Sequence, residues 1–428
     1  MKKQISKTEL EKRINLNYNR LAESDYYKID QVFSPYDYDW QGDKEGRALL
    51  AFVSHYKISG KKIPCMREMI RELPKKLNKE GFLGAEHSEI IIEQQLSGHS
   101  WLLRGLCEYY EQFGDAYVLE VINSIVENLF LPTKNTYSTY PINRDSKDEG
   151  GVSGSEIGSV GNWRLSSDVG CAFMSIDGLS HSYKVTKNPL VKDLLDEMIS
   201  IYLSIDKIAL KVQTHCTLTA ARGMLRMYSV LNDEKYLNGA MEILNLYTNQ
   251  GGMTLTFQNL NWWGRPDTWT EPCAIVDSLM VACELYKTTK KEEYRKTAAK
   301  IYHNGFSTLQ RDNGGAGTDT VITAESPWDS LKVHMYEAPF CCSMRLAEGL
   351  WYINANADLL YAETDGVVTK NENGVYMDGD IVYTLPNDSL IPFAEDFCEI
   401  DGMKLSPIVK YYKVPKEIID TAEQKIIF

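Results

Sequence analysis

The sequence predicts a mainly α-helical protein, a ring of helical hairpins of the (α/α)6 toroid type with a small β-rich appendage at its C-terminal end. Three observations lead to this prediction. Amphipathic helical segments alternate with short polar breaks from about residue 65 to about residue 352. Many of these breaks begin with tyrosine. After about residue 356, apolar and polar residues alternate around Asn373-Gly374, which is a β-hairpin signal.

The tyrosine-led breaks have the form expected of turns within helical hairpins. They are "YYEQFGDAY" from Tyr109, "YKVTKNPLV" from Tyr183, "YSVLNDEKYL" from Tyr228 and "YKTTKKEEYR" from Tyr286. Each follows one apolar-periodic helix and precedes another, so we expect the tyrosine to close the first helix. A degenerate repeat of hairpins is typical of a solenoid or a closed ring, and six hairpins need roughly 300 residues.

The predicted domain organisation follows these changes of pattern. Residues 1–355 form the helical barrel, with 1–60 as an N-terminal extension that packs on it, and 356–428 form the small β-rich region. Two segments within the barrel, 139–165 and 308–336, are predicted to be long loops. Long loops in compact domains are often functional.

Composition limits the classes of partner. The formal net charge of −13 argues against nucleic acid or an anionic membrane, which would need a basic surface, and a carbohydrate is easier to accommodate. We expect neither a membrane span nor a signal peptide, because the chain has no long apolar run and its first residues are charged. The nine irregularly spaced cysteines then predict reduced thiols in the cytoplasm. The oligomeric state stays open.

Two segments place cysteines at predicted helix starts. In "DTWTEPCAIVDSLMVACELY", Thr270 suits a helix cap and Pro272 the first turn, so Glu271 and Cys273 lie at a helix N-terminus. The second segment, "EAPFCCSMRLAEGLWYI", begins in the same way. Pro339 suits its first helical position, which puts Cys341 and Cys342 in the first turn. A helix N-terminus favours the thiolate form of cysteine.

These four residues make a plausible zinc ligand set. Zinc accepts cysteine sulfur and glutamate oxygen in a tetrahedral shell. His99 and His215 also lie near helix starts, and in a toroid the starts of the inner helices share one rim. The residues alone favour buried, inert cysteines, because free cysteine is among the most buried residue types, and they favour a structural role for each histidine.

A family resemblance favours the zinc interpretation. "TWTEPCAIVDSLMVACELY" followed by "FCCSMRLAEGLWYI" resembles the β-L-arabinofuranosidases of glycoside hydrolase family 127. "EQQLSGHSWLLRGLCEYYEQFGD" and "THCTLTAARGMLRMY" are similar to the two histidine helices of that family. The resemblance spans roughly residues 85–355 and implies a six-hairpin glycosidase barrel with a zinc-dependent retaining mechanism.

The resemblance also implies roles for individual residues. Glu271, Cys273, Cys341 and Cys342 would bind Zn²⁺, and Cys341 would be the nucleophile. His99 and His215 would contact the sugar. Trp163 and Trp263 are candidate substrate platforms, because tryptophan faces suit the apolar faces of sugars, although packing in the core is equally compatible with them.

The sequence departs from the family at two positions. The segment where the family has its acid/base glutamate, "QGGMTLTFQNLNWWG", has no acid, and the matching position is near Leu255. A further family histidine falls near Cys171. Glu337 is the candidate replacement acid, with Asp267 and Asp168 as alternatives.

Three hypotheses follow. The first is a retaining glycosidase with a cysteine nucleophile, acting on β-L-arabinofuranosyl or a related sugar. The second is another carbohydrate-active enzyme, a hydrolase or lyase with a different acid/base, and the third is a non-catalytic barrel that zinc stabilises.

Overall fold

The computed structural model describes residues 1–34, 40–142, 154–265, 268–320, 336–372, 374–384 and 397–408. The chain forms two compact units. The first, which we call the helical unit, holds residues 21–245 and 262–265. The second, the mixed unit, holds residues 1–20, 246–261 and 266–428. The sequence analysis placed a domain boundary near residue 355, where helices give way to strands, and not between these two units. That boundary stays a prediction.

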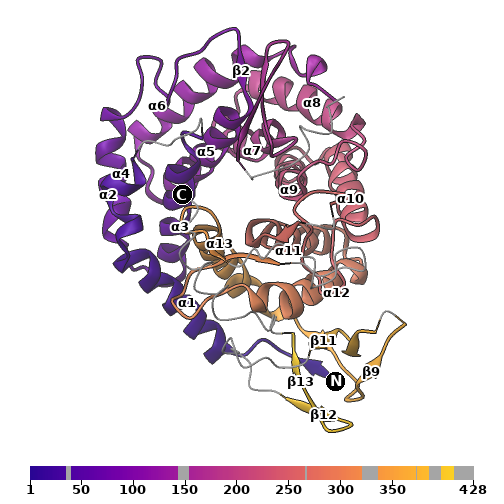
Figure 1. Cartoon of the computed structure of the whole chain (residues 1–428). Coiled ribbons are helices and arrows are strands. Elements are labelled where there is room, and N and C mark those ends of the chain that lie inside the picture. Colours follow the sequence, from indigo (N-terminus) through magenta and orange to yellow (C-terminus); the bar gives the residue numbers. More distant parts are fainter. Residues whose placement is uncertain are drawn as a thin grey trace. The chain divides into compact units, whose positions relative to one another are not determined.

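Helical hairpins make up the helical unit. Its inner helices pack side by side in chain order, and the outer helices lie against them (Figure 1). The inner helices are α3 (Asp43–Ser59), α5 (Glu93–Phe113), α7 (Ser175–Thr186) and α9 (Thr214–Leu231). The outer helices are α2 (Ile29–Val32), α4 (Pro64–Glu72), α6 (Ala116–Ile125), α8 (Pro189–Ser204) and α10 (Glu234–Asn249). Because α3 packs along α5, part of the predicted N-terminal extension belongs to this inner layer.

The hairpin turns end their first helices in one common way. The residue after the helix takes a left-handed conformation, and its N–H donates to the carbonyl oxygen of a tyrosine. The pairs are Gly60 with Tyr56, Gly114 with Tyr110, Lys187 with Tyr183, Asn232 with Tyr228, and Lys290 with Tyr286. The predicted turns are confirmed, with Tyr110 rather than Tyr109 in the first of them. Tyr56 marks a further turn that the sequence analysis missed.

Two glycines let neighbouring inner helices approach closely. A Cβ atom on Gly46 of α3 would lie 2.1 Å from the backbone carbon of Trp101 on α5. A Cβ atom on Gly178 of α7 would lie 2.5 Å from the carbonyl oxygen of Ser100, also on α5. Only glycine fits such backbone contacts, so these two positions set the spacing of α3, α5 and α7.

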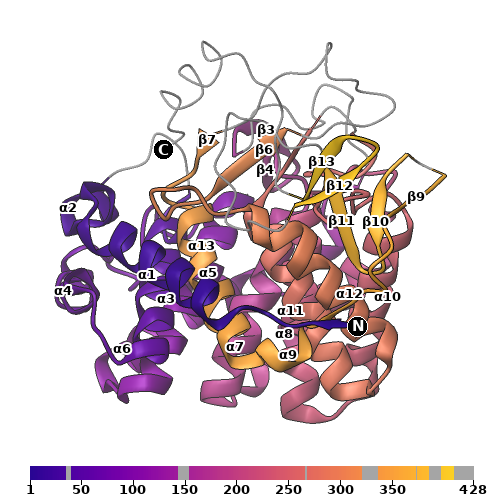
Figure 2. The same cartoon turned by 90° about the horizontal axis from the view of Figure 1, so that it is seen from below.

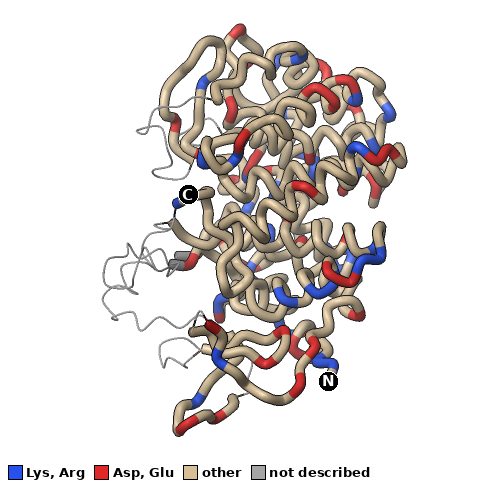
Figure 3. The backbone as a smooth tube through the Cα atoms, turned by 90° about the vertical axis from the view of Figure 1, so that its right-hand side faces the viewer, with Lys and Arg blue, Asp and Glu red and all other residues tan. Residues whose placement is uncertain are grey.

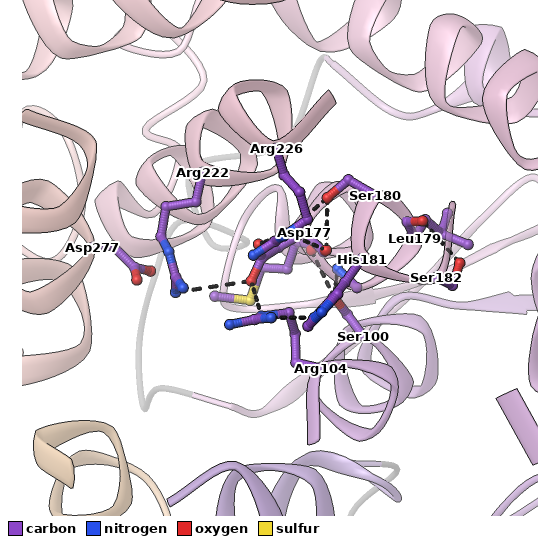
Figure 4. Close-up of polar contacts among 12 residues, drawn as sticks. Ser100, Arg104, Asp177, Leu179, Ser180, His181, Ser182, Arg222, Arg226 and Asp277 are labelled. Atoms are coloured by element: carbon purple, nitrogen blue, oxygen red, sulfur yellow. Dashed lines mark hydrogen bonds and ion pairs between the residues drawn. The ribbon is translucent and has the colours of Figure 1, made fainter. Parts of the chain in front are cut away.

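A buried ion network joins α5, α7 and α9 (Figure 4). The fully buried carboxylate of Asp177 lies 3.0 Å from Nε of Arg104, 2.5 Å from Nη1 of Arg226 and 3.9 Å from Nη1 of Arg222. Burial works to raise the pKa of Asp177, but the three guanidinium groups outweigh it and the pKa falls below its usual value. The network therefore keeps a charged carboxylate between the three helices.

The mixed unit combines helices with small sheets. Its helices are α1 (Lys7–Glu23), α11 (Pro272–Thr289), α12 (Glu292–Lys300) and α13 (Cys342–Asn356). An antiparallel sheet in the order β12-β13-β11-β10-β9 follows them in the chain (Figure 2). Its strands are β9 (Thr369–Lys370), β10 (Tyr376–Asp378), β11 (Ile381–Thr384), β12 (Cys398–Ile400) and β13 (Met403–Pro407). At the other end of the chain, β1 (Lys2–Lys3) pairs with β8 (Ala362–Glu363).

The C-terminal β-rich region is thus confirmed in its described part. β9 and β10 pair on either side of Gly374, as the hairpin prediction required, while Asn373 lies outside the described residues. The prediction of a loop over 139–165 is wrong in part. There, β3 (Glu156–Val160) and β4 (Trp163–Ser166) form an antiparallel pair, and β2 (Ile91–Ile92) joins them through β4. β3 is mostly exposed, so it lacks the apolar alternation that identifies a strand in sequence.

Charges of both signs are interspersed along the described helices (Figure 3). On α12, Glu292 precedes Arg295, and the two side chains pair at 2.6 Å. Interspersed charge of this kind is typical of solvated helix faces. Among the described residues, no helix combines the length and the apolar character that crossing a bilayer requires.

Glu45 gives a pH prediction for the helical unit. Its buried carboxylate accepts the N–H of Gly42 at the start of α3, and burial raises its pKa from 4.5 to about 7. The folded protein therefore holds the proton of Glu45 more tightly than the unfolded chain does. This contribution to the free energy of unfolding is fully present below about pH 4.5 and is lost as pH rises through about 7. Glu45→Gln keeps an acceptor for Gly42 and removes this loss. Urea unfolding at pH 5 and at pH 8 measures the free energy of unfolding of both proteins. The stability of the variant relative to the wild type should rise by roughly 2–3 kcal/mol from pH 5 to pH 8. Exposed Glu120→Gln is the control, and an equal difference at both pH values would contradict the prediction.

Candidate metal and active site

A three-stranded sheet brings two distant segments of the mixed unit together. β6 (Gly317–Thr320) pairs with β5 (Trp269–Thr270) on one side and with β7 (Tyr336–Glu337) on the other. Glu271 follows β5 directly, and Cys341 follows β7 after a short turn. The sheet order β5-β6-β7 therefore sets the start of α11 beside the start of α13.

The helix starts differ from their predicted positions. Glu271, rather than Thr270, is the N-cap of α11, because Thr270 is still in β5. Pro339 lies in a turn, and α13 begins at Cys342 with Cys341 as its N-cap. The N–H of Cys341 donates to Ala338 in that turn. Pro272 does lie in the first turn of α11, as predicted.

The four predicted ligands converge. Their ligand atoms all lie within 4.8 Å of one another. Sγ of Cys273 is 3.1 Å from Sγ of Cys341, which is 3.7 Å from Oε1 of Glu271. Cys273 and Cys342 are buried, while Cys341 is partly exposed. Cys341 is therefore the most accessible cysteine of the set.

The donor set fits a soft divalent cation. Burial, followed by the neighbouring thiols, raises the pKa of Cys273 well above its usual value, and burial does the same for Cys342. Buried thiolates beside a carboxylate are thus unfavourable without a positive charge among them. Three sulfurs and one carboxylate oxygen are a donor set that Zn²⁺ accepts. All nine cysteines are in described residues, and no disulfide joins any two of them.

Salt bridges hold the elements that carry the ligands. Arg345 of α13 pairs with Asp277 of α11, and both side chains are fully buried. The backbone N–H of Glu271 donates to Oδ1 of Asn259 at 2.8 Å. Asn259 belongs to the segment in which the family has its acid/base glutamate. Leu255, in the same segment, is 58% exposed.

Glu337, the candidate acid, has partners for both carboxylate oxygens. Arg20 donates to each oxygen at 2.8 Å, Asn313 donates to Oε2 and the hydroxyl of Ser343 donates to Oε1. This engagement ties α1 to β7 and favours a structural role. The acid/base role of Glu337 stays a prediction. Asp168 is in the helical unit, and Asp267 lies outside the described residues.

The remaining predicted site residues are in the helical unit. His99 is fully buried, with Nδ1 2.8 Å from the carbonyl oxygen of Gln95 and Nε2 accepting the N–H of Leu83. Both ring nitrogens are thus used within the protein, as for a structural histidine. Burial lowers the pKa of His99 to about 4. His215 is buried at the start of α9, and its ring stacks on Trp101.

Neither candidate tryptophan presents a face to solvent. Trp163 is fully buried, packs edge-on against Tyr140 and donates from Nε1 to Thr139. Trp263 is also fully buried, and its backbone N–H donates to Val212. This burial favours a packing role for both, and their contact with substrate stays a prediction.

A second carboxylate and histidine group, in the helical unit, is already balanced by cations. The ligand atoms of Glu108, Glu111 and His181 lie within 4.8 Å of one another. Lys57 pairs with Glu108, and Lys184 pairs with Glu111 at 2.7 Å. These ion pairs explain the group without a metal.

Comparisons with known proteins support the fold. No model of a protein family matches the chain, and no curated protein matches it. Among solved structures, a sugar epimerase from a ruminal bacterium is similar with a TM-score of 0.56 and 12% identity, over 80% of this chain and 98% of that one. A glycoside hydrolase is similar with a TM-score of 0.54 and 11% identity, over 87% of this chain.

A glycoside hydrolase family 127 β-arabinofuranosidase is also similar, with a TM-score of 0.53 and 11% identity over 90% of this chain. The chain spans 62% of that protein and 64% of the glycoside hydrolase, less than two thirds of either. At these identities the similarity shows the fold alone. The chain has the (α/α)6 fold of glycosidases and sugar epimerases, mainly α, with a small C-terminal β part.

Proposed function

We propose that this chain is a zinc-dependent retaining glycoside hydrolase that acts on β-L-arabinofuranosyl or a related sugar. The observation that supports this most is the convergence of Glu271, Cys273, Cys341 and Cys342 at two adjoining helix starts. The fold, which several carbohydrate-processing enzymes share, supports a carbohydrate substrate.

Cys341 is the nucleophile in this proposal because it is the exposed member of the set. Its sulfur attacks the anomeric carbon, so a C–S bond forms as the glycosidic C–O bond breaks, and the departing oxygen takes a proton from an acid. Water then attacks the same carbon and gives a proton to the conjugate base of that acid, while the C–S bond breaks and the configuration is retained. Bound zinc would keep the thiols ionised and make Cys341 a better leaving group.

The mechanism also needs a general acid that protonates the departing oxygen. Glu337 is the candidate in the mixed unit, although its oxygens are engaged by Arg20 and Asn313. General acid catalysis contributes about 10²- to 10⁴-fold, so a substrate with a good leaving group can react without it.

The experiment is intact-protein mass spectrometry after mixing with an aryl β-L-arabinofuranoside. We expect release of the phenol and a pentosyl mass increase, which peptide mapping locates on Cys341. Because the base for the second step is weak or missing, the adduct should accumulate. No adduct and no released phenol would contradict this substrate class.

A second candidate function is another carbohydrate-active enzyme on the same fold. The similar structures include a sugar epimerase and a D-mannose isomerase, and this similarity motivates it. Such an enzyme would depend on a carboxylate or on His215, and Cys341→Ala would spare much of its activity. A panel of free sugars and uronates distinguishes it from the glycosidase, while zinc stabilisation without any turnover would leave only a structural role.

A further inference from the structure

Arg311 lies between β6 and the turn that leads into it. Its Nη2 donates to Oδ1 of Asp319 at 2.8 Å and to the carbonyl oxygen of Thr318 at 3.1 Å, both in β6. Its backbone N–H donates to the carbonyl oxygen of Gly315. Gly314 has a φ of 87° in the same turn, which lets the chain reverse tightly there.

The strand that Arg311 holds is the one that aligns the ligand segments. Asp319 pairs in register with Thr270, which directly precedes Glu271. At the other end of β6, Gly317 pairs with Glu337 of β7. Asp319 is 1% exposed, so its contact with Arg311 is shielded from water. Removing the contacts of Arg311 with β6 would therefore release both segments that carry the ligands, the one after β5 and the one after β7.

The charge of Arg311 also suits this place. One carboxylate and three thiolates around a divalent cation leave a net negative charge in a largely buried site. Cys342 and Glu337 both lie within electrostatic reach of the guanidinium group of Arg311. Because the guanidinium group is already paired with Asp319, it offsets only part of that surplus.

We propose that Arg311 is a positioning residue of the metal site, which fastens β6 between the ligand segments and offsets the charge of the thiolates. This inference rests on the proposed zinc site. Arg311 contacts β6, so it acts on the ligands through the pairing of β6 with β5 and β7.

The test measures zinc affinity by competition with a chromophoric chelator. Arg311→Gln should weaken binding about 10- to 100-fold, and Arg311→Lys, which keeps the charge, should restore part of the loss. The thiolate-to-metal absorption band of the Co²⁺-substituted protein should shift in Arg311→Gln and return toward the wild-type position in Arg311→Lys. The matched control is Arg295→Gln, because Arg295 pairs with Glu292 and Glu363 in the same unit. Should Arg311→Gln not fold, Arg311→Lys alone is compared with Arg295→Lys.

The outcomes separate this inference from the proposed function. A wild-type protein that binds no zinc overturns both. Zinc binding that is unchanged in Arg311→Gln overturns the role of Arg311 and leaves the zinc site in place. Equal losses in Arg311→Gln and Arg311→Lys, with an unchanged cobalt spectrum, also overturn it.

Discussion

Cys341→Ala should lower kcat for an aryl β-L-arabinofuranoside by about 10⁴-fold or more, because it removes the atom that forms the covalent bond. Cys341 is the partly exposed cysteine of the set, whereas Cys273 and Cys342 are buried. The rate is measured by phenol release. The pentosyl adduct should also be absent from the Cys341→Ala variant.

Cys341→Ala also removes one proposed zinc ligand, so the loss needs a control for metal content. Cys273→Ala removes a buried ligand and keeps the nucleophile. At equal zinc occupancy it should retain more activity than Cys341→Ala. Cys283→Ala on α11 is the neutral control, because its thiol is buried and outside the ligand set. Full activity in Cys341→Ala would contradict the cysteine mechanism.

The helical part of the fold was predictable because its signal is local. An apolar stripe and a left-handed C-cap both arise within one helix and its turn, so the breaks after Tyr183, Tyr228 and Tyr286 were found where the structure has them. The turn after Tyr56 was missed, although Gly60 closes it through the same hydrogen bond. That turn precedes residue 65, where the predicted alternation of helices and breaks begins.

The candidate site was predictable in its residues but not in its framework. The Cys341-Cys342 pair and Glu271 were found from residue type and from the family resemblance. The β5-β6-β7 sheet was missed, because strands of two to four residues carry too few positions to show alternation. Arg311 was missed for the same reason, since its role depends on β6.

Burial was the least predictable property of the site residues. His99 and Trp163 have side chains that suit sugar binding, yet both are enclosed in the helical unit with hydrogen-bond partners of their own. A single sequence shows the type of a side chain and its place on a helix, but not what packs against it from distant elements.

Asp177→Ala should destabilise the helical unit by about 3–5 kcal/mol, because it leaves buried guanidinium groups without their carboxylate. Arg104 is 3% exposed and Arg226 is 14% exposed, so water can replace little of the lost interaction. Urea unfolding at neutral pH, followed by circular dichroism, measures the effect. Asp177→Asn should cost less, since the amide still accepts a hydrogen bond from Arg226.

The pH dependence distinguishes the lost charge from lost packing. The pKa of Asp177 is lowered in the folded state, so its ionised form contributes stability above its unfolded value of 3.8, and this is lost as pH falls through the folded pKa. The wild type and Asp177→Ala should therefore differ most at neutral pH and converge in strong acid. Asp25→Ala, which breaks an exposed pair with Lys28, should change stability by less than about 0.5 kcal/mol. A loss in Asp177→Ala that is equally small would show that packing, rather than this ion network, holds α5, α7 and α9 together.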